Sequence, residues 1–366
     1  MHLSKPPKKI VIVQTAFIGD VVFLSPLVHA IKKSFEETQI SVLVRPYASQ
    51  VAKCIPGVDK VLTFDKHGEE SGPPGILKAA RRIRKEKFDL LIAPHRSTRT
   101  AILSGLTRIP LRVGFRQGLG RLVYHVAVDP IPNESCNLIQ NFNLLEKIGI
   151  PADDSRLRLK SPADNRAYVE KFFTTNGLQA DDKLVALCVG AFWQTKRWPA
   201  VYFASLGESL KERGYQPIMF GGPNERELAL KINKTIKTPL KSCVGNSLAE
   251  TAILLSRCEA AIGGDSGLTH MARALGLATV LIYGPTDQKA HIFNEKSKVL
   301  TAKVKCRPCS HHGPRKCPDK HHDCMRMVSP ENVLDALRKI ANLQTPIPLA
   351  ERQTSGKRAD ATPMPV

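Results

Sequence analysis

Residues 263–270, with the sequence GGDSGLTH, follow an apolar run at 260–262 and lead into the segment MARALG at 271–276. This order predicts a strand, a glycine-rich turn and a helix, followed by a second strand at 279–283. Small residues let backbone amides approach a ligand, and a helix N-terminus adds a partial positive charge. The turn is therefore suited to a phosphate or diphosphate, although Gly and Asp are also ordinary turn and cap residues.

The same alternation of strands and helices runs through the rest of the chain. We predict strands at 9–14, 40–45, 60–64, 90–93, 111–114, 184–189, 216–220, 260–262 and 279–283. We predict helices at 21–35, 48–54, 75–86, 97–105, 135–147, 165–176, 200–214, 225–234, 248–256, 269–275 and 330–342. This rhythm predicts an α/β fold with parallel sheets and helices on both faces of each sheet.

The polar, proline-bearing stretch 150–164 is the predicted linker between two domains. The predicted domains are residues 1–160 and 161–328, each Rossmann-like, followed by a C-terminal helix at 329–343 and a tail at 344–366. The Pro, Thr, Ser and charge content of the tail predicts disorder. Two doubly wound sheets imply a central cleft, with ligands bound outside the carboxyl ends of the strands.

The composition is that of a globular protein with a sizeable core, because 42% of its 366 residues are hydrophobic. The best candidate for a membrane span, residues 10–31, is interrupted by Asp20 and lacks the cleavage-site pattern of a signal peptide. We therefore expect a cytoplasmic protein. Five of the nine cysteines stand in apolar surroundings, which is typical of reduced thiols: Cys54, Cys136, Cys188, Cys243 and Cys258.

The formal net charge of +21 indicates a polyanionic partner. The excess is spread evenly, with +11 in residues 1–160 and +10 in residues 161–366. Nucleic acid, an anionic membrane surface and a phosphorylated substrate all remain candidates, and general solubility is the alternative without a partner. Aromatic residues make up only 6% of the chain, and no aromatic-basic platform of the kind that binds single strands is visible.

Three charged residues at predicted strand ends are candidates for chemistry. Asp20 opens a helix after the first strand, where it is either an N-cap or a general base at the mouth of the cleft. Lys196, beside Arg197 and between the only two tryptophans, can neutralise a diphosphate or can be a solvated loop charge. Glu225 can accept hydrogen bonds from ribose hydroxyls or can simply favour a helix N-terminus.

Five short motifs in order make the pattern specific: IGDV at 18–21, KRWP at 196–199, GPNE at 222–225, GDSGLTH at 264–270 and YGPTD at 283–287. In this combination the chain resembles the ADP-heptose:lipopolysaccharide heptosyltransferases of glycosyltransferase family 9, and most of all their heptosyltransferase II branch. The resemblance implies a GT-B fold, with two Rossmann-like doubly wound domains facing a central cleft. It also implies a C-terminal helix that can pack back on the first domain.

The resemblance implies an inverting transferase that moves heptose from ADP-L-glycero-D-manno-heptose to the lipopolysaccharide inner core, with the second heptose addition favoured. ADP-heptose is the donor substrate and no cofactor is required. The first domain is expected to bind the acceptor and the second to bind the donor. The expected partners are the lipopolysaccharide core with lipid A and the anionic inner face of the inner membrane, contacted peripherally by a monomer that does not bind nucleic acid.

The same resemblance assigns roles to single residues. Asp20 matches the proposed catalytic base, and Lys196 matches a lysine that binds the donor and its leaving diphosphate. Ala191 and Phe192 depart from the pattern, because some relatives carry a Thr-Thr pair there on the diphosphate. Backbone amides or Thr195 are expected to take over this contact. The resemblance assigns further donor contacts to Glu225, Asn246, Asp265, Ser266, Gly267 and His270.

Two groups of basic residues are candidates for the phosphates of the acceptor. The run at 81–87 can equally be a solvated helix face. The looser set after the strands is the preferred acceptor site and comprises Arg96, Arg99, Arg116 and Arg121, with Arg112 nearby. Both groups can also attract an anionic membrane.

The remaining cysteines, Cys306, Cys309, Cys317 and Cys324, crowd one segment with His321 and His322. This spacing is typical of a zinc site. We nevertheless expect no metal, because the family's chemistry requires none and reduced thiols beside the donor site also explain the pattern. The alternative functions are another GT-B nucleotide-sugar enzyme of cell-envelope synthesis and, in a different class, a basic zinc-knuckle protein that binds nucleic acid.

Overall fold

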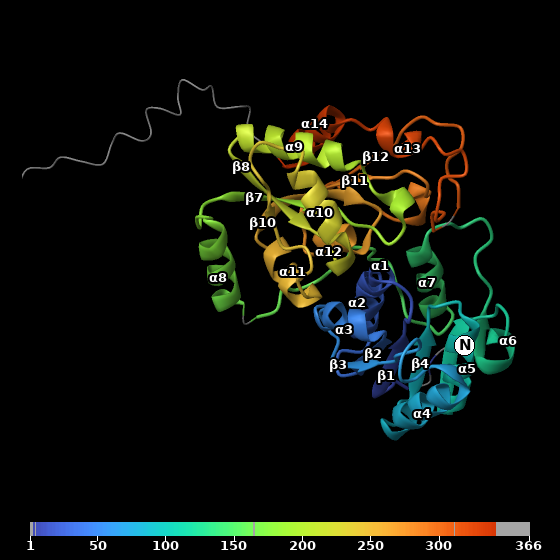
Figure 1. Cartoon of the computed structure of the whole chain (residues 1–366). Helices are drawn as coiled ribbons and strands as arrows, with labels where there is room; N and C mark the ends of the chain where they lie inside the picture. The colour runs from blue at the N-terminus through green and yellow to red at the C-terminus, as the bar shows by residue number, and fades with distance from the viewer. Residues whose placement is uncertain (1–2, 4, 164, 311, 342–366) are drawn as a thin grey trace, which may run out of the picture.

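The computed structural model describes residues 3, 5–163, 165–310 and 312–341, so the predicted tail at 344–366 lies outside the described residues. The described chain forms two lobes, each built on a six-stranded sheet (Figure 1). The strand orders are β3-β2-β1-β4-β5-β6 and β12-β11-β10-β7-β8-β9, and every pairing is parallel. Both orders are that of the doubly wound Rossmann fold, with the topological switch at β1/β4 and at β7/β10.

The first lobe carries the first seven helices. Its strands are β1 (Lys9–Val13), β2 (Gln39–Val44), β3 (Lys60–Thr63), β4 (Leu90–Ala93), β5 (Leu111–Phe115) and β6 (Val126–Val128). Its helices are α1 (Ile18–Val22), α2 (Ser25–Ser34), α3 (Ser49–Lys53), α4 (Gly72–Lys85), α5 (Thr98–Thr107), α6 (Gly120–Val123) and α7 (Asn137–Glu146), with a 3-10 turn η1 (Pro46–Ala48).

The second lobe carries the other seven helices of the described residues. Its strands are β7 (Lys183–Cys188), β8 (Tyr215–Phe220), β9 (Lys241–Ser242), β10 (Cys258–Gly264), β11 (Ala278–Ile282) and β12 (Ser297–Leu300). Its helices are α8 (Arg166–Asn176), α9 (Ala200–Glu212), α10 (Arg226–Asn233), α11 (Leu248–Leu255), α12 (Gly267–Ala274), α13 (Asp323–Arg326) and α14 (Pro330–Ala341), with 3-10 turns η2 (Gln194–Lys196), η3 (Pro223–Glu225) and η4 (Gln288–Ala290).

The apolar run of β1 shows why these segments become central strands. Ile10 and Ile12 pack into one buried cluster, whereas Val11 and Val13 pack into another on the opposite face of the sheet. A strand covered by helices on both faces needs apolar residues at every position rather than at alternate ones. The continuous apolar run of β1 therefore suits its place between β2 and β4 in the sheet.

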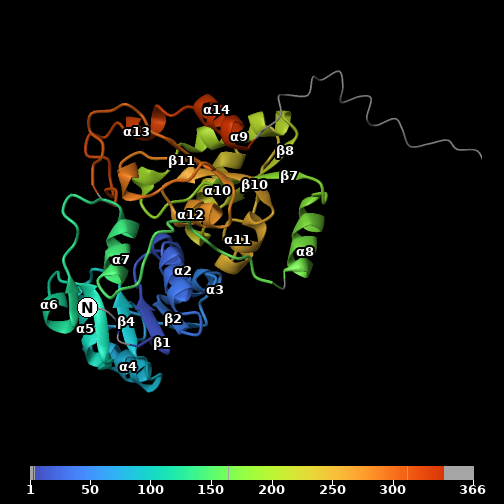
Figure 2. The ribbon, with the colours of Figure 1, turned by 180° about the vertical axis from the view of Figure 1, so that it is seen from behind.

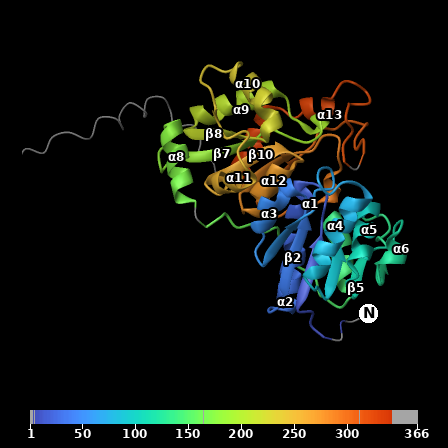
Figure 3. The ribbon, with the colours of Figure 1, turned by 60° about the horizontal axis from the view of Figure 1, so that its bottom comes forward.

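The two lobes pack directly against each other beside the cleft. Helix α1 contacts α12, and α3 contacts α11, as Figure 3 also shows. One buried apolar cluster runs through both lobes. The predicted linker joins this interface, because the Leu159 amide donates to the Ala274 carbonyl (2.8 Å) and the Lys160 amide donates to the Cys54 carbonyl (2.8 Å).

The expectation that the C-terminal helix packs back on the first domain is wrong. Helix α14 packs against α9, β10, β11 and β12 of the second lobe, and Figures 1 and 2 show it beside α9, far from the first sheet. Its apolar side chains Val333, Leu334, Ala336 and Leu337 are buried there. They cover one face of the second sheet, which would otherwise expose an apolar surface.

Element boundaries differ from the predictions where turns interrupt an apolar pattern. The predicted helix at 21–35 is two helices, α1 and α2, and Pro26 stands in the first turn of the second. The short elements β6, β9, β12, α6 and α13 were not predicted, since two to four residues carry little periodicity. Among the described residues, no helix is both long and apolar enough to cross a membrane.

Candidate active site

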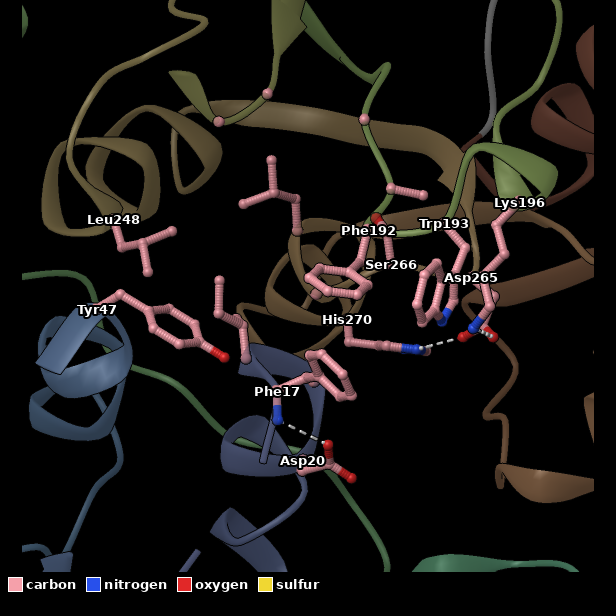
Figure 4. Close-up of a pocket in the computed structure, with 18 of the residues that line it drawn as sticks. Phe17, Asp20, Tyr47, Phe192, Trp193, Lys196, Leu248, Asp265, Ser266 and His270 are labelled. Carbon is pink, nitrogen blue, oxygen red and sulfur yellow. Dashed lines mark hydrogen bonds and ion pairs between the residues drawn. The ribbon is translucent and has the colours of Figure 1, made fainter. Parts of the chain in front are cut away.

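A cavity of about 650 Å³ lies between the lobes at the strand ends of both topological switch points. Its wall in the first lobe includes α1, and its wall in the second lobe includes the segments after β7, β8 and β10 (Figure 4). Eight predicted residues line this one cavity: Asp20, Lys196, Glu225, Asn246, Asp265, Ser266, Gly267 and His270. The fold thus brings together residues that are up to 250 positions apart in the chain.

Asp20 lies in the first turn of α1 and lines the cavity, with its carboxyl group beside the Phe17 amide (Figure 4). Its Oδ2 atom accepts a hydrogen bond from the Phe17 amide at 3.0 Å. Burial raises the pKa of Asp20, and the Phe17 amide and the neighbouring His312 and His291 offset this only in part. A carboxylate held in this way is a stronger base than one in water, which suits it to accept a proton.

Asp265, directly after β10, is the centre of a polar network. Its Oδ2 atom accepts from Lys196 Nζ (2.6 Å) and Thr286 Oγ1 (3.0 Å), and its Oδ1 atom faces His270 Nε2 (3.1 Å) and His291 Nε2 (3.5 Å). Burial by itself raises the pKa of Asp265, but the histidine hydrogen bonds and the Lys196 charge outweigh it and hold the pKa well below 3.8. Asp265 is therefore an ionised anchor rather than a base.

His270 has a defined tautomer in this network. Arg273 donates to its Nδ1 atom at 3.2 Å, so Nε2 carries the proton and donates to Asp265. Burial lowers the pKa of His270 to about 3, and the hydrogen bond to Asp265 opposes this effect only in part. His270 is therefore neutral at physiological pH and acts as a hydrogen-bond donor to the anchor.

Lys196 reaches Asp265 because its loop crosses β10 at a glycine. A Cβ atom on Gly264 would lie 2.4 Å from the Lys196 carbonyl oxygen, so any other residue would push the loop away. The ammonium group has three N–H donors, and one satisfies Asp265. The others can serve an anionic ligand in the cavity that Lys196 lines.

Glu225 is held by a partner that the sequence did not single out for this purpose. Arg197 Nη2 donates to Glu225 Oε1 at 2.7 Å, and the Gly222 amide donates to Oε2 at 2.8 Å. Only 9% of Glu225 is exposed. Arg197 thus orients the carboxylate at the floor of the cavity and balances its buried charge, a role that needs the loops after β7 and β8 to meet.

The N-terminus of α12 faces the N-terminus of α1 across the lobe interface. Ser266 caps α12, with its Oγ atom 3.0 Å from Thr269 Oγ1, and Gly267 begins the helix. A Cβ atom on Gly267 would lie 2.8 Å from Ile18 Cβ, so the two helices approach this closely only with glycine there. The unpaired amides of both first turns give this end of the cavity a partial positive charge.

Thr195 does not replace the missing Thr-Thr pair. Its hydroxyl donates to the Pro314 carbonyl, and the side chain is buried against that segment rather than in the lining of the cavity. Phe192 instead projects into the cleft, where its ring lies 4.8 Å from that of Phe17 in the other lobe (Figure 4). The expectation for Thr195 failed because a neighbouring loop, far away in sequence, provides a better acceptor.

The four predicted acceptor arginines lie outside the described lining of this cavity. Arg96 stacks over the Phe115 ring (4.3 Å) and Arg99 donates to the Lys66 carbonyl (2.9 Å). Arg116 pairs with Asp129 (2.9 Å), and it lines a separate, shallower depression with Arg121. The structure therefore divides the set between the edge of the cleft and the outer face of the first lobe.

Three further polar residues line the cavity although no role was predicted for them, namely Arg45, His291 and His312; Arg197, predicted to neutralise a diphosphate beside Lys196, instead pairs with Glu225. His291 and Arg197 complete the networks above, and His312 enters the lining from the cysteine-bearing segment. Arg45, directly after β2, also lines the cavity, and its position at a strand end was a signal that the sequence already contained.

Together, the fold and the site define a class. Two Rossmann-like lobes facing one cleft form a GT-B fold, and a basic, helix-capped pocket beside a buried carboxylate is suited to a nucleotide-sugar substrate. A sequence model of glycosyltransferase family 9 (heptosyltransferase) matches residues 76–318, and the chain belongs to this family. It is therefore a glycosyltransferase, and the resemblance inferred from the five motifs is confirmed. The nucleic-acid-binding alternative is set aside.

Curated relatives match the chain over nearly its whole length. Lipopolysaccharide heptosyltransferase 2 of Escherichia coli K12 is 25% identical over 351 residues, which cover 91% of this chain and 98% of that protein. Lipooligosaccharide heptosyltransferase 2 of Campylobacter jejuni serotype O:6 is 26% identical over 343 residues, which cover 91% and 99%.

Solved structures confirm the predicted fold. The glycosyltransferase family 9 protein of Veillonella parvula superposes with a TM-score of 0.83 at 22% identity, covering 94% of this chain and all of that one. The structure described as E. coli ADP-heptose lps heptosyltransferase II superposes with a TM-score of 0.71 at 20% identity, covering 91% and 98%.

Proposed function

We propose that the protein transfers L-glycero-D-manno-heptose from ADP-heptose to a heptose of the lipopolysaccharide inner core, with inversion at the anomeric carbon. The observation that carries the proposal is the single cavity that joins Asp20 of one lobe to Lys196, Asp265 and the α12 N-terminus of the other. Similarity to proteins named heptosyltransferase 2 supports the choice of donor and of the second addition.

Asp20 is the proposed general base. The acceptor hydroxyl oxygen forms the new bond to the anomeric carbon while the bond from that carbon to the diphosphate oxygen breaks. The hydroxyl proton passes to Asp20, and ADP leaves with the electron pair. The raised pKa of Asp20, which burial causes, supports this role because it strengthens the carboxylate as a proton acceptor.

Lys196 and the first turn of α12 are proposed to stabilise the charge that builds on ADP. Ser266 and Gly267 offer backbone amides, and Lys196 offers the N–H groups that Asp265 leaves unused. Asp265 then holds Lys196 in place and can accept from a sugar hydroxyl. Glu225 and Asn246 lie further along the same cavity, where ribose and adenine are proposed to bind.

The first domain, residues 1–160, is the proposed acceptor side, and residues 161–328 are the proposed donor side. Arg45 lines the cavity, and two further cations lie behind it, because Lys66 Nζ donates to the Thr15 carbonyl and Arg99 donates to the Lys66 carbonyl. The pKa of Lys66 is lowered by burial and then by the charges of Arg45 and Arg99, so these cations repel one another. A phosphate of the core region would relieve that repulsion.

We also propose that the protein works on the cytoplasmic face of the inner membrane, as a monomer that touches the lipid peripherally. Helices α5 and α6 support this contact, because Leu119 and Leu122 are 38% and 75% exposed there. Arg108 and Arg121 are exposed beside them. Each such cation near anionic lipid contributes about 1 kcal/mol.

The basic run at 81–87 is a weaker candidate for the lipid contact. Two of its side chains already have partners, because Arg82 pairs with Glu70 and Arg84 donates to the Thr107 carbonyl.

The membrane contact is tested by flotation with vesicles of phosphatidylglycerol and phosphatidylethanolamine at low and high salt. Binding at low salt should fall steeply with added salt, and Leu122→Asp should weaken it. Leu230→Asp is the matched control, because Leu230 is 63% exposed on α10 of the other lobe. Equal losses in the two variants would overturn the assignment of this face.

The reaction is tested by mass analysis of products from ADP-heptose and core acceptors truncated before and after the first heptose. The expected result is one added heptose on the acceptor that already carries one. Addition only to the heptose-free acceptor would assign the first step instead. Tighter binding of UDP than of ADP in calorimetry would indicate another nucleotide-sugar transferase with the same fold.

A further inference from the structure

Four cysteines of this chain fall in one short stretch; three of them are only half-buried, and Cys324 is buried at the edge of the second lobe's apolar core. Cys54, Cys136, Cys188, Cys243 and Cys258 are buried, as predicted for core thiols. The others follow one another within 19 residues in the pattern C-x2-C-x7-C-x6-C, at Cys306, Cys309, Cys317 and Cys324. A close pair followed by two further cysteines is the ligand spacing of structural metal sites.

Three of these cysteines lie in the segment between β12 and α13, and Cys324 lies in α13 itself. Between Leu300 and Asp323 the described residues form neither a helix nor a strand. Cys309 Sγ donates to the Cys306 carbonyl at 3.4 Å, so the pair is folded back on itself. A Cβ atom on Gly284 would lie 3.1 Å from Cys324 Sγ, and the Cys309 amide donates to the next carbonyl, that of Pro285, so Cys309 and Cys324 lie at the same turn after β11.

The surrounding charges suit a cluster of thiolates. Segment 301–326 contains seven basic and two acidic residues, which gives it a formal charge of +5. Four thiolates around one Zn²⁺ carry a net charge of about −2. Without such an anion, the basic side chains of this segment repel one another at the surface of an already basic lobe.

His321 supports the cluster as a hydrogen-bond donor. Its Nδ1 atom accepts from the Asp323 amide at 2.9 Å, so Nε2 carries the proton and points toward Cys306 Sγ at 3.9 Å. Donors of this kind stabilise a metal-bound thiolate and fix its orientation. Asp319, whose carboxylate also lies near Cys306 and His321, orients the imidazole from the other side.

We propose that one structural Zn²⁺ is bound by the four thiolates of Cys306, Cys309, Cys317 and Cys324. The ion is not a cofactor of the transfer reaction. It replaces the hydrogen-bond ladders that this long segment lacks, and it draws the sulfur atoms together as it displaces their protons.

The ion's position gives it a structural role at the proposed donor pocket. The Cys309 amide donates to the Pro285 carbonyl (2.8 Å), and Arg307 Nε donates to the Gly284 carbonyl (2.7 Å). A Cβ atom on Gly313 would lie 3.0 Å from Lys196 Cε, so the segment also backs the lysine. Loss of the ion should loosen this wall and weaken ADP binding, a consequence that rests on the proposed function.

The first test measures the metal content of the full chain, purified under reducing conditions without chelator. One zinc per chain is expected, and chelation should make four additional thiols react with a thiol reagent under native conditions. Zinc far below one per chain, even after incubation of the reduced protein with zinc salt, would overturn the proposal. Iron at that stoichiometry would overturn the choice of Zn²⁺.

The second test compares Cys309→Ser and Cys317→Ser with Cys54→Ser and Cys243→Ser as matched controls. The first pair should lose zinc affinity by at least the roughly 10–100-fold that removal of a supporting residue costs, and the second pair should keep it. Equal zinc content in all four variants would overturn the ligand assignment. Zinc bound by a protein that fails to use ADP-heptose would refute the proposed function but not the metal site.

Discussion

Asp20 of the first lobe and Asp265 of the second border the same cavity but have opposite electrostatic surroundings. Each follows a switch-point strand, lies at the start of a helix and borders the same cavity. Burial by itself would raise the pKa of both carboxyl groups. Asp20 receives one backbone hydrogen bond and its pKa stays raised, whereas Lys196, His270 and His291 drive the pKa of Asp265 well below its usual value.

The difference teaches that two carboxylates at one cavity can be tuned for opposite tasks. A carboxylate with few partners in a buried place is a base, and a carboxylate surrounded by cations and donors is an anchor. The proposed chemistry needs one of each, because the acceptor proton and the leaving diphosphate make opposite demands. The following predictions test whether the two aspartates differ in this way.

The largest expected effect is that of Asp20→Asn on turnover. The variant keeps the hydrogen bond from the Phe17 amide but cannot take a proton, so kcat should fall by roughly 10²–10⁴-fold while the Kd of ADP stays unchanged. Kinetics with ADP-heptose and calorimetry with ADP measure the two quantities. Asp153→Asn, at an exposed site on the linker, is the control. Near-normal turnover would leave Asp20 as a purely structural first-turn residue.

The next largest effect is expected for Lys196, the ion-pair partner of Asp265. Lys196→Ala should weaken ADP binding by roughly 10–100-fold, because the diphosphate loses a charged hydrogen-bond donor worth about 1.5–3 kcal/mol. Lys289→Ala is a suitable control, because Lys289 lies on η4 outside the cavity lining. An unchanged Kd for ADP in calorimetry would remove Lys196 from the donor site.

The third prediction concerns stability and has opposite signs for the two aspartates. Asp265→Asn should lower the melting temperature at pH 7, because breaking a buried ion pair costs about 3–5 kcal/mol. Asp20→Asn should raise it by on the order of 2 °C, because an ionised group with a raised folded pKa is destabilising above that pKa.

Thermal unfolding across pH tests the cause of both shifts. The depressed pKa of Asp265 gives stability that is present above its unfolded pKa and is lost as the pH falls through its folded pKa. The cost of ionised Asp20 disappears as the pH falls from its raised folded pKa toward 3.8, so the gain from Asp20→Asn should vanish there. Shifts of equal sign at pH 7 would contradict the contrast between the two residues.

The smallest expected effect is that of the aromatic contact between the two lobes. Phe17 and Phe192 meet across the cleft, and an aromatic pair contributes about 0.5–1.5 kcal/mol, less when exposed as Phe192 is. A double-mutant cycle with Phe17→Ala and Phe192→Ala should give a coupling of no more than about tenfold in kcat/KM. Strictly additive losses would show that the contact does not help to close the cleft.

Part of the cavity wall could be predicted because its signals are local. The turns at 15–20 and 263–270 each combine an apolar strand, small residues and a helix start within a short stretch, and the fold brings both to one cavity. The acceptor arginines were harder to predict, because a basic residue after a strand can point into the cleft, as Arg45 does, or pair elsewhere, as Arg116 does with Asp129.

The sequence by itself determined the two parallel sheets, the family and eight of the residues around the cavity, because strand periodicity and glycine-rich turns act over a few neighbouring positions. Only the tertiary structure decided that Thr195 turns toward Pro314, that α14 covers the second sheet and that Asp20 and Asp265 differ in pKa. Each of these depends on partners from distant segments, such as Lys196 and His291 for Asp265. Burial and charge at a residue are set by what the fold packs around it, and local sequence does not specify those neighbours.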